Sequence, residues 1–292
     1  MLIDGRKLAA ELGGELTGRI AALGTAPGLA IVVATDDAST AWYVRSLLRT
    51  AEKLGIAARR IDLPTDADAA TIRAALAEAA ATPGTHGVIC QTPLPGGLTL
   101  TDVGSAIPPE ADVDGANPVS LGLLAAGAPD AFPPATAAAV LRILDHEGVD
   151  LVGRRAVVIG RSNVVGKPAA LMLLARHATV TVCHSRTPDL PAVAREADVL
   201  VAAVGRPELV TAEYVKPGAV VIDVGTNATA DGGLVGDVAT GAVEQVAAAV
   251  TPVPGGVGAV TTMVLMSHVV AAAERQGQSA DAATRRSSTR PA

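Results

Sequence analysis

A strand, a tight turn and a helix start in the second half of the chain suggest the first chemistry. Residues 157–160 form an apolar run that ends at Gly160, and the turn continues as Arg161-Ser162-Asn163-Val164-Val165-Gly166-Lys167-Pro168. Glycines at such a turn let the backbone approach a pyrophosphate, and the free amides of the new helix attract its charge. The pattern departs from G-x-G-x-x-G, because Ser162 replaces the middle glycine and the next glycine is Gly166. By itself it indicates a dinucleotide site weakly, since a structural glycine turn explains it almost as well.

The end of the next strand-like run strengthens the dinucleotide interpretation. Residues Thr179–Cys183 lead into His184-Ser185-Arg186-Thr187, with no carboxylate before Asp189. Sites that prefer NAD usually place an acidic residue here for the ribose 2′-hydroxyl. A serine hydroxyl and the planar donor fork of an arginine suit a 2′-phosphate instead. The sequence therefore favours NADP, with Ser185 and Arg186 near that phosphate; the alternative is that Arg186 is only a solvated turn residue.

The elements that position these residues alternate between strand and helix patterns. In the first half we expect strands at 28–34, 57–63 and 86–91 and helices at about 39–54 and 68–81. This order implies a parallel sheet with right-handed crossovers, whose sites lie in loops at the carboxyl ends of the strands. Pro- and Gly-rich loops follow the third strand, from Thr92 to Pro118.

A second series of the same kind follows a linking helix at about 136–146. Its strands are expected at 156–160, 179–183, 199–204 and 219–224, and a last helix at about 261–275 is expected to pack back on the first domain. Residues 276–292 are small, polar and charged, which predicts a disordered tail. The sequence thus predicts an α/β protein with two domains: an N-terminal domain of residues 1–135 and a Rossmann-type parallel-sheet domain of residues 136–260.

Composition narrows the class of protein. The 292 residues are 49% hydrophobic but only 1% aromatic, so the cores must be built from Ala, Val, Leu and Ile. A net charge of −6 argues against a nucleic-acid binder. Cys90 and Cys183 end apolar runs and are expected to be reduced and buried. No charge-free stretch has the look of a membrane span and MLIDGRKLAA lacks a signal-peptide layout, so we expect a cytoplasmic protein.

The histidines do not suggest a metal centre. His86, His146, His177 and His268 show no metal-ligand spacing, and His184 is expected to be a positioned loop residue rather than a catalyst. No metal site is predicted.

Taken together, these residues resemble the methylenetetrahydrofolate dehydrogenase/cyclohydrolase family, the bifunctional folate enzymes. The resemblance runs along nearly the whole chain, up to about Arg275. The segments that carry it occur in the family's order: the Tyr43 helix, Gln91-Thr92-Pro93-Leu94-Pro95, Asp112-Val113-Asp114-Gly115, Gly160-Arg161-Ser162-Asn163-Val164-Val165-Gly166-Lys167-Pro168, Val221-Ile222-Asp223-Val224-Gly225 and Thr251-Pro252-Val253-Pro254-Gly255-Gly256-Val257-Gly258.

The resemblance implies a folate substrate in a cleft between the two domains. Tyr43 would stack on the aminobenzoyl ring, Asp114 would hold the pterin's amino and ring N–H groups, and Gln91 would lie beside the reactive carbon. Pro254-Gly255-Gly256 would line the folate site. Taken singly, Tyr43 could cap a core, Asp114 could belong to an Asx turn and the glycines could form only a loop; as a set they favour the folate site.

The resemblance also implies the cofactor contacts and the assembly. It places Gly160-Arg161-Ser162, Ser185 and Thr226 on NADP, and it suggests a homodimer that acts in one-carbon metabolism.

Three departures from the family mark a divergent member. Leu47 stands four residues after Tyr43, where the family has a lysine; residues four apart share a helix face. The family's Pro-Cys-Thr-Pro-x-Gly segment is Pro134-Ala135-Thr136-Ala137-Ala138-Ala139 here, and Ala259-Val260 replaces the usual Pro-Met.

Leu47 bears on one half of the family's chemistry. Oxidation of the methylene carbon hands a hydride to NADP and needs orientation rather than proton transfer. Hydrolysis of the resulting methenyl group needs a general acid–base residue, a task that the family's lysine carries. Lys53 lies about 240° around the helix from Leu47 at roughly 100° per residue, and the neighbours Arg45 and Arg49 cannot deprotonate usefully. We therefore expect an active dehydrogenase with an impaired or lost cyclohydrolase.

Two other functions stay open at this stage. The protein could be a diverged paralogue that acts on another compound, because the altered segments at 134–139 and 259–260 reshape the pocket. It could also be a non-catalytic folate- or nucleotide-binding regulatory protein. The retained Tyr43, Gln91 and Asp114 favour the dehydrogenase.

Overall fold

The structure is a computed structural model that describes residues 1–229 and 232–288, with the backbone helix alone over 279–288. The chain divides into two compact units. Unit 1 comprises Met1–Leu12, Leu123–Ala128 and Pro133–Val264; unit 2 comprises Gly13–Gly122, Pro129–Phe132 and Leu265–Ala292. Both units are α/β and both of their main sheets are parallel, which confirms the predicted fold class.

The first residues of the chain fall in unit 1, although the sequence suggested a single N-terminal domain of residues 1–135. Backbone pairing explains this difference. The amide of Ile3 donates to the carbonyl of Val250 at 2.9 Å, and the amide of Val250 donates to the carbonyl of Met1 at 3.0 Å. The N-terminus thus extends the edge of the unit 1 sheet, a long-range contact that local sequence patterns do not carry.

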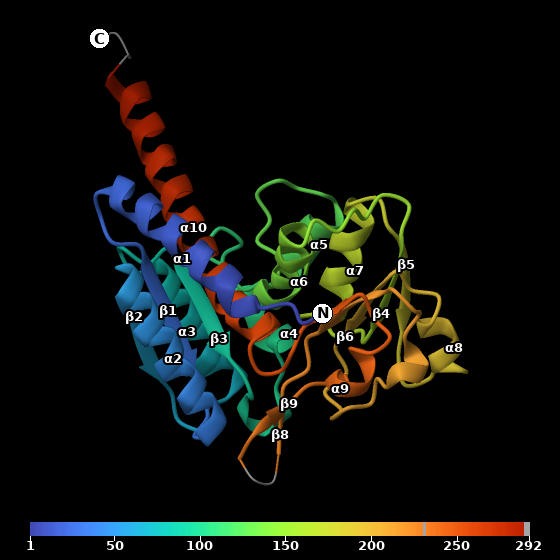
Figure 1. Cartoon of the computed structure of the whole chain (residues 1–292). Coiled ribbons are helices and arrows are strands. Elements are labelled where there is room, and N and C mark those ends of the chain that lie inside the picture. Colours follow the sequence, from blue (N-terminus) through green and yellow to red (C-terminus); the bar gives the residue numbers. More distant parts are fainter. Residues whose placement is uncertain (230–231, 289–292) are drawn as a thin grey trace. The chain divides into compact units, whose positions relative to one another are not determined.

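Unit 2 is built on the sheet β2-β1-β3, with α2 and α3 packed against it (Figure 1). Its elements are β1 (Gly28–Val33), α2 (Ala38–Leu54), β2 (Ala57–Asp62), α3 (Ala69–Ala81) and β3 (Gly87–Gln91). All six residues of the central strand β1 are buried, as its apolar sequence requires. The three strands and two helices predicted for this half are confirmed within one or two residues at each end.

The caps of α2 follow from the sequence at its ends. The side chain of Asp37 accepts a hydrogen bond from the amide of Thr40 at 2.8 Å and satisfies one of the free amides of the first turn. Gly55 ends the helix with φ +83°, a left-handed conformation that glycine adopts without steric cost. The helix therefore begins and ends where its sequence signals are.

The unit 2 parts of two long helices lie alongside each other (Figure 1). α1 (Gly5–Leu23) was not predicted, and α10 (Val257–Ser288) is longer than the predicted 261–275. Arg19 joins them through a two-pronged ion pair with Glu274, with N–O distances of 3.0 and 2.7 Å. Nδ1 of His268 lies 2.8 Å from the carbonyl oxygen of Val113 and fixes α10 to the loop after β3.

α10 also bears on two expectations about the C-terminal part. Residues 276–288 are helical, where the sequence predicted a disordered tail; residues 289–292 lie outside the described residues. Val257–Gln278 is long and apolar enough to cross a membrane, contrary to the expectation from sequence, but half of that stretch is buried. Such burial is typical of a core helix, so this one stretch is weak evidence for a membrane span.

Unit 1 is built on a five-stranded parallel sheet of order β10-β7-β6-β4-β5. Its elements are α6 (Ala135–His146), β4 (Arg155–Ile159), α7 (Gly166–Ala175), β5 (Thr179–Cys183), α8 (Leu190–Ala194), β6 (Val199–Ala202), η3 (Ala212–Tyr214), β7 (Val220–Asp223), α9 (Thr240–Val243) and β10 (Ala249–Val250). A short antiparallel hairpin, β8 (Asn227–Ala228) with β9 (Leu234–Val235), follows β7. The chain goes from β4 outward to β5 and then returns to β6 on the other side of β4, so the strand order reverses at β4.

The remaining pieces of unit 2 are η1 (Pro95–Gly97), α4 (Leu100–Val103), η2 (Gly104–Ala106) and the start of α5 (Pro118–Ala125). Both cysteines are free and buried: Cys90 lies in β3 and Cys183 ends β5. No group of three or more His, Cys, Asp or Glu side chains that could hold a metal ion occurs in the part of the chain that was described.

Candidate functional site

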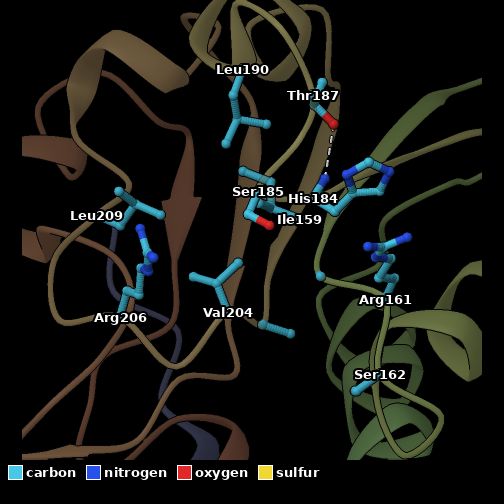
Figure 2. A pocket seen from close by; sticks show the side chains of 12 residues that line it. Ile159, Arg161, Ser162, His184, Ser185, Thr187, Leu190, Val204, Arg206 and Leu209 are labelled. Atoms are coloured by element: carbon cyan, nitrogen blue, oxygen red, sulfur yellow. Dashed lines mark hydrogen bonds between the residues drawn. The ribbon is translucent and has the colours of Figure 1, made fainter.

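A pocket of about 520 Å³ opens at the carboxyl ends of β4, β5 and β6 (Figure 2). Open α/β sheets bind ligands at this place, where the strand order reverses. The pocket is lined by Ile159, Gly160, Arg161, Ser162, His184, Ser185, Thr187, Leu190, Ala203, Val204, Arg206 and Leu209. The topology and the lining together indicate a nucleotide site.

The turn after β4 supplies the first wall. Gly160 has φ +130°, and a Cβ there would collide with the carbonyl of Ala203, so only glycine fits. Gly166 starts α7, and its missing Cβ leaves room for the carbonyl of Gly160. Gly160, Arg161 and Ser162 line the pocket, and their contact with NADP stays a prediction. Gly166 serves close packing behind the turn and is not among the lining residues.

Ser162 has a local role that the sequence pattern did not show. Its hydroxyl accepts hydrogen bonds from the amides of Val165 and Gly166 at 3.1 and 3.3 Å. The middle position of the glycine motif therefore carries a side chain that satisfies the first amides of α7. Those amides are less free to hold a phosphate than in a motif with glycine there.

The loop after β5 supplies the second wall. The amide of His184 donates to the hydroxyl of Thr187 at 2.9 Å, and the amide of Arg186 donates to Nδ1 of His184 at 3.2 Å. His184 is thus a positioned loop residue, as predicted, and it lines the pocket with Ser185 and Thr187. Arg186 and Thr226 are exposed and are not among the lining residues, so their contact with a cofactor stays a prediction.

The loop after β6 is the part of the pocket that sequence reasoning missed. Ala203, Val204, Arg206 and Leu209 come from it, and Leu190 comes from the start of α8. The available signal was the Gly205-Arg206-Pro207 turn directly after a buried strand. Only the strand order shows that this turn lies next to the one after β4.

Two buried carboxylates anchor the loop after β6. Asp237, 0% exposed, accepts hydrogen bonds from the amides of Val204, Gly205 and Arg206 at 2.6, 3.0 and 2.8 Å, and from Nδ2 of Asn227 at 3.0 Å. A carboxylate that accepts this many hydrogen bonds holds the backbone of the loop after β6 in one conformation.

Asp223 at the end of β7 supports Asp237 in turn. It accepts from the amides of Gly225, Asp237 and Val238 at 2.9, 2.9 and 3.0 Å. Burial, with a smaller contribution from the negative charge of Asp237, raises the pKa of Asp223 to about 6, against the three amides that lower it. A Cβ on Gly225 would collide with Asp237, so the Val221–Gly225 motif builds the support of the pocket.

The residues that the resemblance assigns to folate on the N-terminal side all lie in unit 2. Tyr43 is on α2 and Gln91 ends β3. Burial, with the negative charge of Asp114 second, raises the pKa of the Tyr43 phenol. Burial first, and the charge of Asp114 second, thus favour the neutral phenol. Gln91 donates from Nε2 to the carbonyl of Thr92 at 3.1 Å.

A buried aspartate organises the loop that carries Asp114. Asp112, 0% exposed, accepts from the amides of Ala116 and Asn117 at 2.8 and 2.9 Å and from the hydroxyl of Ser120 at 2.5 Å. Burial raises the pKa of Asp112, and these three hydrogen bonds oppose that shift. Asp112 therefore shapes the loop, while Asp114 remains half-buried.

Leu47 lies on the buried face of α2. It is 0% exposed and belongs to the buried stripe Thr40, Val44, Leu47 and Ala51. A leucine at this position supplies apolar contact and no titratable group. The place where the family has a lysine is apolar in this chain.

The Pro254-Gly255-Gly256 loop belongs to unit 1. Pro254 follows a cis peptide bond and is exposed, whereas Gly256 is buried. A Cβ on Gly256 would lie 2.9 Å from Cβ of Thr251, and a Cβ on Gly5 would collide with the carbonyl of Gly256. Packing alone accounts for Gly256, so its contact with folate stays a prediction, as does the expected cleft.

The fold and this pocket define an α/β protein with a dinucleotide-binding unit of the Rossmann type. Comparison with known families agrees. The NAD(P)-binding domain of tetrahydrofolate dehydrogenase/cyclohydrolase matches residues 134–277, and the catalytic domain of the same family matches residues 3–114. The chain belongs to the tetrahydrofolate dehydrogenase/cyclohydrolase family.

Relatives of this chain are similar over nearly their whole length. A bifunctional protein FolD from Nocardia farcinica is 56% identical over 276 residues, which cover 94% of this chain and 97% of the relative. A second from Parafrankia sp. is 58% identical and covers 93% of this chain and 98% of the relative.

Solved structures show the same similarity. The FolD methylenetetrahydrofolate dehydrogenase/cyclohydrolase from Campylobacter jejuni has a TM-score of 0.91 at 35% identity, covering 94% of this chain and 99% of its own. The Trypanosoma brucei enzyme, complexed with NADP and an inhibitor, has a TM-score of 0.89 at 36% identity and covers 94% and 98%.

Proposed function

We propose that this protein oxidises 5,10-methylenetetrahydrofolate to 5,10-methenyltetrahydrofolate with NADP, as part of one-carbon metabolism. The pocket of unit 1 carries the choice of NADP. Its described lining includes the guanidinium of Arg161 and the hydroxyls of Ser185 and Thr187, and no carboxylate. Such a set suits a 2′-phosphate and lacks the carboxylate that usually accepts a hydrogen bond from the ribose 2′-hydroxyl of NAD.

NADP, when bound, supplies the acceptor for the hydride. The residues of this chain then bind and orient the folate, since the nitrogen lone pairs of the substrate stabilise the developing cation without proton transfer. The neutral phenol of Tyr43 would stack on the aminobenzoyl ring and the carboxylate of Asp114 would hold the N–H groups of the pterin. The effect of the Asp114 charge on the Tyr43 phenol supports a shared role in binding one ligand.

The following hydrolysis of the methenyl group is proposed to be impaired or lost. That step needs a group that gives and takes protons, and the loss of one such residue typically costs roughly 10²–10⁴-fold in rate. The fully buried Leu47 occupies the position of the family's lysine and cannot supply one.

An absorbance assay tests the proposal. Purified protein is given methylenetetrahydrofolate with NADP or with NAD, and the formation of NADPH and of the methenyl product is followed separately. We expect both signals to rise together with NADP, and methenyl-folate supplied alone to be hydrolysed no faster than in a Tyr43→Ala control.

Other outcomes select the alternative functions. Binding of folate and NADP without turnover would indicate a regulatory binding protein, and binding of NADP without folate would indicate a paralogue with another substrate. Rapid hydrolysis of methenyl-folate would contradict the proposed loss of the second activity.

The proposal includes a homodimer in the cytoplasm, as the resemblance to the family suggests. Light scattering on the purified protein measures the mass, which would be twice 29.1 kDa. Cell fractionation with an antibody measures the location.

A further inference from the structure

Arg206 is a second arginine of the nucleotide pocket, and nothing in the family's motifs assigned it a role. Figure 2 shows Arg206 and Leu209 on one side of the pocket and Arg161 with His184 on the other. Arg206 is exposed, and among the residues described no ion pair engages its guanidinium. Its side chain is therefore available to a ligand.

The pocket also has an apolar part, of which Leu209 lies on the same side as Arg206 (Figure 2). Leu190, Val204 and Leu209 line it and are all half-buried. Partly exposed apolar side chains around a slot suit a flat aromatic group rather than a phosphate. The residues after the second strand of such a fold meet the adenosine ribose. We therefore expect the base joined to that ribose to lie in the part of the pocket that these apolar side chains line.

The backbone of this loop cannot take over the binding. The amides of Val204, Gly205 and Arg206 all donate to the buried carboxylate of Asp237. A ligand that meets this loop must therefore meet its side chains. The same hydrogen bonds set the direction in which the side chain of Arg206 leaves the loop.

We propose that the planar guanidinium of Arg206 covers the adenine base of the cofactor, and that Asp237 is the positioning residue that holds Arg206 there. A guanidinium stacks on aromatic faces and combines a cation–π attraction with a flat contact. The inference rests on the proposed use of NADP. It separates two tasks: Arg161 and Ser185 meet the 2′-phosphate, whereas Arg206 meets a part that NADP and NAD share.

Titration calorimetry on the full-length protein tests this separation, with NADP and NAD as probes at low and high salt. The Arg206→Gln variant is expected to lose roughly 3- to 30-fold in affinity for both cofactors by the same factor. The loss should change little with salt, because stacking is less screened than an exposed ion pair. Arg154→Gln is the matched control, because it removes an exposed arginine just before β4, at the opposite end of that strand, and should leave both affinities unchanged.

The positioning role has its own readout. Asp237→Asn keeps the shape of the side chain but turns an amide donor toward the loop amides, so the KM for NADP should rise while kcat and the KM for folate stay near wild type. Added to Arg206→Gln, it should cause little further loss, since both changes remove one contact. Should Asp237→Asn not fold, Arg206→Lys tests the same contact: it keeps the charge without the flat fork and should recover less than half of the lost binding energy.

Three results would overturn the inference. One is a loss confined to NADP, which would place Arg206 on the 2′-phosphate. Another is unchanged affinity in Arg206→Gln, and the third is additive losses in the double variant. A wild-type protein that binds neither cofactor would overturn the proposed function as well, so the two failures are distinguishable.

Discussion

Replacing Leu47 by lysine restores the one group that the proposed hydrolytic step lacks. Leu47 is 0% exposed on the buried face of α2, four residues after Tyr43. The variant Leu47→Lys places an amine on the same helix face as the phenol. We expect methenyl-folate hydrolysis to rise by roughly 10²–10⁴-fold, the usual contribution of a positioned acid–base residue.

The burial of position 47 sets the cost of this change. An uncompensated buried charge destabilises a protein by about 3–5 kcal/mol. The four-carbon stem of lysine keeps part of the apolar contact of leucine, which reduces that cost. Burial also favours the neutral amine, the form that can act as a base. Because domains are stable by about 5–15 kcal/mol, the variant should fold, with a melting temperature lower by roughly 6–20 °C.

Leu47→Met is the matched control, because it keeps the apolar volume and adds no titratable group, at less than about 1.5 kcal/mol. The decay of methenyl-folate absorbance is measured for wild type and both variants, after circular dichroism has shown that each is folded. The reasoning is refuted if folded Leu47→Lys still oxidises methylenetetrahydrofolate yet hydrolyses the methenyl form no faster than Leu47→Met.

Three further predictions concern stability. The pKa of Asp223 is raised from 3.8 to about 6 in the fold, so its ionisation destabilises the native state progressively as the pH rises from about 4 to 6. The destabilisation of Asp223→Asn relative to wild type, measured by urea unfolding, should therefore shrink over this window by on the order of 3 kcal/mol; a constant difference would contradict the raised pKa. Asp112→Asn should lower the free energy of unfolding by about 1.5–3 kcal/mol, because three hydrogen-bond donors lose a charged acceptor. The variant should also raise the KM for folate, because the loop that carries Asp114 is displaced. An unchanged KM would contradict the idea that Asp112 positions Asp114. Arg19→Ala removes the ion pair between Arg19 and Glu274, whose side chains are 38% and 33% exposed, respectively. We therefore expect the free energy of unfolding, measured by thermal unfolding, to fall by only about 1 kcal/mol. A fall above about 3 kcal/mol would show that solvent screens this ion pair less than its exposure implies.

Local patterns in the sequence determined most of the elements. The strands β1, β2, β3 and β5 and the helices α2 and α3 lie where apolar runs, caps and glycines predict them, because these signals act between near neighbours. The patterns failed for the two-residue strand β10, which is too short to show a period, and for α1, whose interior glycines Gly13, Gly14 and Gly18 weaken the helix signal.

The sequence by itself also determined the family, the preference for NADP and the missing lysine at Leu47, since these depend on which residues stand at given positions and in what order along the chain. Only the tertiary structure decided that the loop after β6 lies beside the turn after β4, that Asp237 holds this loop, and that Arg206 enters the pocket. The reason is that β4 and β6 are neighbours through hydrogen bonds between segments some forty residues apart. Such pairing follows from the burial of the whole sheet and leaves no trace in any short stretch of sequence.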